Sequence, residues 1–124
     1  MIKYITILVL LFLLRFQAMA QPSFAKLVGK WESPEGMGLV VIDSSRIFLY
    51  YGKDTRQVNS FQFDFSKTPC SFDFVLKDSA GSLSLKSLFL LISDNMLQWQ
   101  LFDDSRPDNF SSEKGEMVYL RRKQ

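Results

Sequence analysis

The feature that most constrains the fold is a strict alternation of apolar and polar residues in the middle of the chain. Within Gln57–Ser66, every second position from 61 to 65 carries an aromatic ring: Phe61, Phe63 and Phe65. The alternation recurs within Ser71–Lys77, at Phe72, Phe74 and Leu76. Successive side chains of a β-strand point to opposite faces, so each segment has one apolar face. Two such strands in succession predict an antiparallel sheet over a hydrophobic core.

Shorter apolar runs extend this pattern over most of the chain. The breaks between them contain Gly, Pro, Asp or Ser, which supply turn geometry. A single helical turn over Ser23–Val28 comes first, and a loop over Asp103–Gly115 precedes the last strand. The predicted strands are Gly29–Ser33, Met37–Ile42, Arg46–Tyr51, Gln57–Ser66, Ser71–Lys77, Ser82–Ser93, Met96–Phe102 and Glu116–Arg122.

Eight short antiparallel strands without a long helix predict an all-β fold. A meander of this size removes its exposed edges by closing, so we expect a small eight-stranded antiparallel up-and-down barrel with a short N-terminal helical turn. A sandwich of two sheets is the alternative. The length fits one domain with one core.

The N-terminus has the three zones of a secretion signal. Lys3 supplies the positive charge, Ile5–Leu14 is an apolar run, and Ala18-Met19-Ala20 has the small residues that signal peptidase requires. Arg15 ends the run at half of the about 20 residues that a membrane span needs. We therefore expect residues 1–20 to be removed, residues 21–124 to form the barrel domain, and the product to be periplasmic or secreted with no membrane span.

The charge of the expected mature chain argues against nucleic acid as a partner. Lys3 and Arg15 leave with the signal, so residues 21–124 carry 13 basic and 13 acidic side chains. A nucleic-acid-binding domain shows a basic stripe or patch. The sequence contains a single short basic cluster, Arg121-Arg122-Lys123, at its end.

Two parts of the chain resemble known proteins. Gly29-Lys30-Trp31, directly after the predicted helical turn, resembles the Gly-x-Trp motif of lipocalins and their relatives. The C-terminal half resembles an uncharacterised family of small lipocalin-like (calycin-type) domains of exported bacterial proteins. The residues that carry this second resemblance are Asp64–Pro69, Ser93–Leu97, Arg106–Phe110, Gly115 and Val118–Arg122.

The chain departs from that family in its shorter first half and in lacking a glycine at the start of Leu88–Ile92. The family has no assigned activity, so the resemblance implies a barrel fold and no functional residue. In lipocalins the tryptophan of the motif lies at the closed end of the barrel, under an arginine of the last strand. The resemblance therefore implies a cation–π contact between Trp31 and an arginine.

The alternation of the last strand decides between the two candidate arginines. Arg122 shares a face with Val118 and Leu120, whereas Arg121 shares a face with Met117 and Tyr119. If the aliphatic face is the inner one, Arg122 is the closer to Trp31, and Arg121 takes its place only if a bulge shifts the register. Arg106 is a further structural candidate, since its guanidinium could anchor the loop to main-chain carbonyls or to Asp108.

The absence of histidine removes most catalytic chemistry. No Ser–His or Cys–His pair and no histidine-containing zinc site is possible. We expect Cys70 to be a buried, inert thiol, and the aspartates at positions 103, 104 and 108 to be solvated loop residues rather than a cation site. These residues predict a non-enzymatic protein without a metal or cofactor.

The aromatic residues of the predicted inner face have two interpretations. They either line a cavity for a small apolar ligand or fill the core: Phe61, Phe63, Phe65, Phe72, Phe74 and Trp99. An eight-stranded barrel is only just wide enough for its own side chains or for one small ligand. Because these side chains are bulky, a filled core is the favoured interpretation.

Two functions remain open. The first is an exported barrel that binds a small apolar ligand. The alternative is a solid barrel that acts as a protein–protein interaction or envelope-associated module. Leu88–Ile92 supports the alternative, because a strand that is apolar on both faces needs a cover from the helical turn or from another protein. An open cavity on the order of several hundred Å³ would favour ligand binding.

Overall fold

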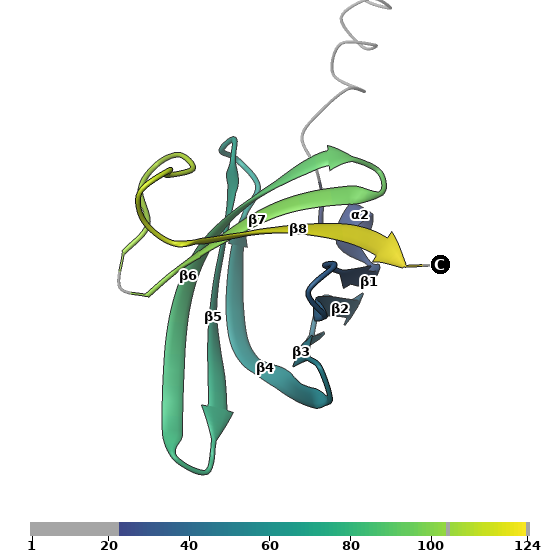
Figure 1. Cartoon of the computed structure of the whole chain (residues 1–124), viewed down its shortest axis with the longest axis vertical. Helices are drawn as coiled ribbons and strands as arrows, with labels where there is room; N and C mark the ends of the chain where they lie inside the picture. Colours follow the sequence, from purple (N-terminus) through teal and green to yellow (C-terminus); the bar gives the residue numbers. More distant parts are fainter. Residues whose placement is uncertain (1–22, 104, 124) are drawn as a thin grey trace, which may run out of the picture.

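The computed structural model describes residues 23–103 and 105–123, and the expected signal at residues 1–20 lies outside them. The elements are α2 (Phe24–Leu27), β1 (Gly29–Glu32), β2 (Met37–Asp43), β3 (Arg46–Tyr51), β4 (Asp54–Asp64), β5 (Cys70–Asp78), β6 (Gly81–Ser93), β7 (Met96–Phe102) and β8 (Glu116–Lys123) (Figure 1). In this described part, no helix is long and apolar enough to cross a membrane.

Each strand pairs antiparallel with the next one, and β1 also pairs with β8, so that the sheet closes into a barrel. Trp31 stands at the seam, opposite Leu39 of β2 on one side and Arg122 of β8 on the other. The predicted eight-stranded antiparallel barrel with its N-terminal helical turn is therefore confirmed. The sandwich alternative is wrong, because the two sheet edges are hydrogen-bonded to each other.

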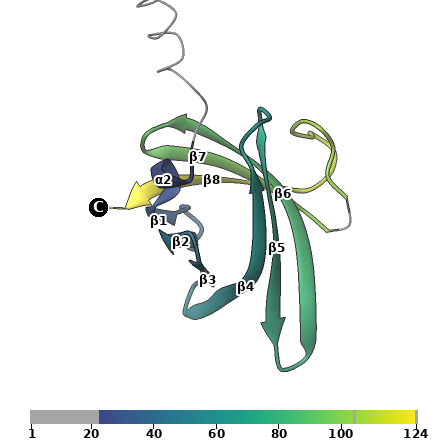
Figure 2. The same ribbon diagram turned by 180° about the vertical axis from the view of Figure 1, so that it is seen from behind.

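Strand β4 is longer than predicted and serves two neighbours. It begins at Asp54 rather than Gln57, because a two-residue turn with Gly52 at φ 61° already returns the chain from β3. Its first residues, Asp54–Gln57, pair with β3, and the segment Val58–Asp64 pairs with β5. The register shifts between Val58 and Ser60, at a bulge. Figures 1 and 2 show β4 curving where it passes from one partner to the other.

The aromatic residues predicted for the inner face share one core. Phe72, Phe74 and Trp99 are fully buried, and the other three pack against them half-buried: Phe61, Phe63 and Phe65. The rings of Phe63 and Phe72 stack with their centroids 4.3 Å apart. Leu27 of α2 is buried in the same cluster, so the helical turn covers this end of the barrel. Contacts between rings add about 0.5–1.5 kcal/mol per pair to the effect of burial.

The outer face of β6 is buried at Leu88, beside the loop that precedes β8. Leu88 is buried although it points outward, and its cross-strand partner Gln100 is only 1% exposed. The Gln100 Nε2 donates to the carbonyls of Ser111 (2.7 Å) and Lys114 (2.8 Å), and the Ser111 N–H donates to Oε1 (2.9 Å). The loop before β8 thus lies over this face. The Leu88 end of the segment Leu88–Ile92 is therefore buried beside a loop of the same chain, whereas Ile92 at its other end is 49% exposed. A cover of the rest of this segment by another protein stays a prediction.

Candidate ligand-binding pocket

The barrel contains a pocket of about 800 Å³ at the end opposite α2. It lies where β2, β4, β6 and β8 begin and where β3, β5 and β7 end. Most of the side chains that line it are apolar or charged, and Tyr50, Tyr51 and Ser105 complete the lining. The apolar ones are Met37, Leu49, Leu76, Leu85, Leu101 and Phe102, and the charged ones are Asp54, Arg56, Asp103, Lys114 and Glu116.

The two kinds of side chain differ in exposure. The leucines and Met37 are half-buried and Phe102 is buried, whereas all five charged residues are exposed. The pocket therefore combines an apolar interior with a charged mouth. Both signs of charge are present at that mouth, from Arg56 and Lys114 on one hand and three carboxylates on the other. Such a site suits a molecule with an apolar body and a polar end.

The bulge in β4 is what brings Arg56 to the pocket. Extending the alternation of Phe61, Phe63 and Phe65 backwards places Arg56 and Val58 on the outer face. The register shift between Val58 and Ser60 exchanges the inner and outer positions of the strand before it. Val58 is consequently buried in the core, and Arg56 stands opposite Leu49, a pocket residue of β3. Periodicity alone could not reveal Arg56, because a bulge changes the face without a clear signal in the sequence.

The six aromatic residues proposed from the sequence as ligand contacts do not line this pocket. Phe63, Phe72 and Trp99 surround a void of about 10 Å³ next to Leu27, at the other end of the barrel. That half is filled by side chains, and the cavity lies in the other half. Leu76 and Leu85 continue the inner-face alternation of their strands, so the sequence predicts the face on which they lie but not that they line a cavity.

The end of the barrel near α2 is held by Arg122. Its guanidinium carbon lies 4.3 Å from the centroid of the Trp31 ring, on the face predicted by the alternation of the last strand. The Trp31 Nε1 donates to the carbonyl of Leu27 (2.9 Å). The Arg122 guanidinium donates to three main-chain carbonyls, those of Lys26 (2.7 Å), Val28 (2.7 Å) and Asp94 (3.0 Å). Arg121 is exposed on the outer face, opposite Glu32 of β1.

Arg106 anchors its loop to a different residue than predicted. Its Nη1 forms an ion pair with Asp73 of β5 rather than with Asp108. Asp73 lies on the outer face of β5, opposite Gln62 and Lys86 of the neighbouring strands. Together with Gln100, this ion pair attaches both halves of the loop to the barrel. Asp108 is therefore not the partner of this ion pair, because the course of the loop brings Arg106 to a strand 33 residues earlier in the chain.

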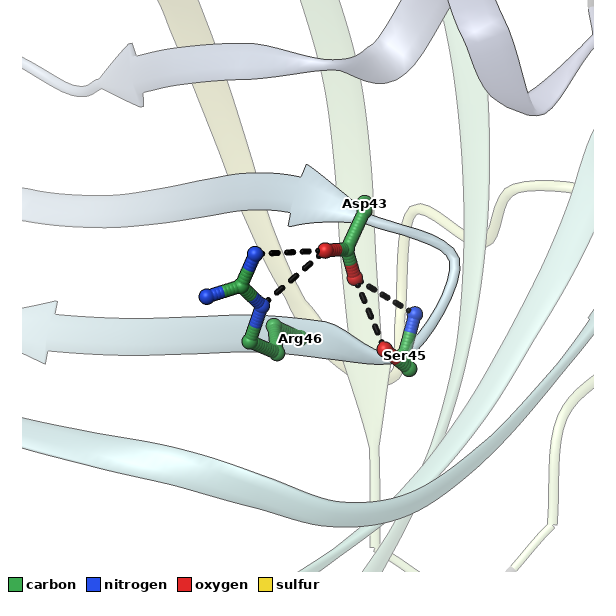
Figure 3. Close-up of polar contacts among 3 residues, drawn as sticks. All are labelled: Asp43, Ser45 and Arg46. Carbon is green, nitrogen blue, oxygen red and sulfur yellow. Dashed lines mark hydrogen bonds and ion pairs between the residues drawn. The ribbon is translucent and has the colours of Figure 1, made fainter.

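Among the described residues, Tyr50 is the pocket residue with an altered pKa, which burial raises. The other titratable groups with altered pKa values do not line the pocket. At the turn between β2 and β3, Asp43 accepts hydrogen bonds from the Arg46 guanidinium (2.8 and 2.9 Å) and from the N–H and hydroxyl of Ser45 (both 2.9 Å) (Figure 3). Arg46, then Ser45, hold the pKa of Asp43 well below its usual range. Burial raises the pKa of the Cys70 thiol, and a protonated thiol is a poor nucleophile.

The fold and this pocket define the class: a closed eight-stranded antiparallel barrel that is filled at one end and open at the other. Comparison of the chain with known protein families, with curated protein sequences and with solved structures gave no match. The resemblance to lipocalin-like domains of exported proteins stays a prediction from the sequence.

Proposed function

We propose that this chain is an exported, non-enzymatic barrel that binds a small, largely apolar molecule in its open-end pocket. The observation that carries the proposal is the pocket of about 800 Å³. Small-molecule sites have volumes of about 300–1,000 Å³ and are lined mainly by apolar side chains with a few polar groups. Export is proposed from the three zones of residues 1–20.

The lining suggests how a ligand would lie. An apolar body would cover Leu49, Leu76, Leu85 and Leu101, and each Å² removed from water contributes about 25 cal/mol. A polar end would stay at the mouth, within reach of the charged side chains. The ligand is thus expected to be amphipathic, with its apolar part inside.

Filling the pocket tests this proposal. Leu85→Trp places an indole in the cavity from β6, and Ile92→Trp is the matched control, because Ile92 is a 49% exposed residue of the same strand and does not line the pocket. The probe is N-phenyl-1-naphthylamine, an apolar dye that fluoresces when it leaves water. We expect saturable binding to the wild type, affinity reduced about tenfold or more in Leu85→Trp, about 1.4 kcal/mol, and unchanged affinity in Ile92→Trp.

Thermal unfolding followed by circular dichroism establishes that both variants are folded. If the wild type gives no saturable signal, or if folded Leu85→Trp binds the dye as well as the wild type does, the pocket is not the binding site. Native mass spectrometry of protein purified from its own host then identifies any ligand that the wild type retains.

A further inference from the structure

The β5–β6 hairpin extends beyond the rest of the barrel. β5 pairs with β6 from Gly81 onward, whereas the pairing of β7 with β6 begins only at Lys86. Along Gly81–Leu85, none of the described strands adjoins β6 on its second side. Gly81–Ser84 are exposed and Leu85 is half-buried. Figures 1 and 2 show the tip of this hairpin projecting past β7 and β8.

The open edge has none of the features that usually prevent pairing. Native edge strands are protected by lysine, proline or a bulge, because their free N–H and C=O groups otherwise accept another strand. The segment Gly81-Ser82-Leu83-Ser84-Leu85 contains no charge and no proline, and its ladder with β5 is regular. Leu83 is 55% exposed in the middle of it. This edge is therefore competent to add a strand.

We propose that the edge pairs with the same edge of a second copy, antiparallel, around a twofold axis at Leu83. In a symmetric dimer, residue i contacts residue j and j contacts i. An axis at Leu83 places Leu83 opposite Leu83, and Ser82 opposite Ser84. The segment is self-complementary in this register: two apolar side chains meet on the inner face, two hydroxyl pairs meet on the outer face, and no like charges oppose each other.

The pairing would also change the surroundings of the pocket. Leu83 is on the same face of β6 as Leu85, a pocket residue, and lies farther toward the tip. The second copy's Leu83 would extend the apolar wall beyond the mouth of the pocket. A five-residue contact is small compared with the about 1,600 Å² of a standard interface, so the dimer forms at high protein concentration and dissociates on dilution.

Disulfide trapping tests both the partner and the register. Opposed residues of antiparallel strands have Cα atoms about 4.5–5.5 Å apart, within the range of a disulfide. In a Cys70→Ser background, we expect Leu83→Cys to form a covalent dimer under mild oxidation. Ser82→Cys and Ser84→Cys should cross-link with each other when mixed, and more slowly when each is alone. Ile92→Cys, exposed on the same strand, is the control.

Sedimentation velocity supplies the second measurement. The wild type should show a monomer–dimer equilibrium. Leu83→Lys places two positive charges opposite each other at the axis and should weaken the dimerisation affinity about tenfold or more. A wild type that stays monomeric while Leu83→Cys cross-links no faster than Ile92→Cys overturns the proposal. If Leu83→Cys cross-links but the mixture of Ser82→Cys and Ser84→Cys cross-links no faster than either variant alone, the proposed register is wrong. Neither result bears on ligand binding, which is measured with a dye on dilute protein.

Discussion

Arg122 is the residue on which the closed end of the barrel depends. It covers the Trp31 ring and hydrogen-bonds the carbonyls that lead into β1 and into the β6–β7 turn. Gly29 makes room for it, since a Cβ at that position would lie 2.6 Å from the Arg122 Nη1, and its φ of 137° disfavours any other residue. The planar, multi-donor guanidinium fits this role, which a lysine ammonium could not fill.

Arg122→Ala is predicted to destabilise the barrel by about 1–3 kcal/mol, because it removes a cation–π contact and leaves main-chain carbonyls without their donor. Arg121→Ala, one residue away on the outer face, is predicted to change stability by less than about 0.5 kcal/mol. Urea denaturation of both variants measures the difference. In a double-mutant cycle with Trp31→Phe, Arg122→Ala should show coupling; strict additivity would contradict the contact.

Asp43 is predicted to stay ionised through the range near pH 4 in which an unperturbed aspartate takes up its proton. Because its pKa is lowered in the folded state, its contribution to stability is present above the ordinary pKa and is lost as the pH falls through the folded value. Arg46→Ala should return the pKa toward the ordinary range. NMR of the carboxyl carbon measures this titration, and Asp64, whose pKa is lowered by Ser66, should be unaffected.

At the scale of elements, Gln100 and Arg106 attach the loop between β7 and β8 to the sheet. The amide of Gln100 uses both its donor and its acceptor groups on the loop backbone. Close packing adds to this, since a Cβ at Gly115 would lie 2.6 Å from the Phe102 ring. A connection without regular structure is thus fixed to the sheet surface and covers Leu88.

Gln100→Ala is predicted to release the loop and to lower the free energy of unfolding by about 1–3 kcal/mol, because buried carbonyl and N–H groups lose their partners. Gln98→Ala, two residues earlier on the same face of β7, is the control. Hydrogen exchange measures the outcome: the Ser111 and Lys114 amides should exchange faster in Gln100→Ala alone. Equal exchange in both variants would show that packing, not Gln100, orders the loop.

The elements also show what the sequence could predict. Alternation and turn residues predicted every strand, because both depend on neighbouring residues. The start of β4 was missed because its first residues are polar and do not alternate with apolar ones. The bulge at Val58 and the ion pair of Arg106 with Asp73 were missed because each depends on pairing with another strand. The covered outer face of Leu88 was noticed as apolar, but its cover could not be identified without the course of the loop.

At the scale of the whole molecule, the barrel is divided into a filled half and an open half. Its filled half follows from the aromatic residues and from Leu27 of α2. The other half stays open because the inner-face leucines there are smaller than the aromatic side chains, and because the long β5–β6 hairpin extends its wall. Composition predicted a choice between a solid core and a cavity; the structure contains both, one above the other, because large and small side chains are segregated along the strands.

The pairing of β1 with β8 determines the order in which the barrel can be completed. Every other ladder joins strands that are consecutive in the chain, but the closing contacts of Arg122 reach back 94 residues to Val28. Contacts between distant segments carry a larger entropic cost and form slowly. A ribosome makes the chain from its N-terminus, so seven strands emerge before the eighth exists. Trp31 of the first strand of the barrel therefore lacks its contact with Arg122 until the eighth strand has been made.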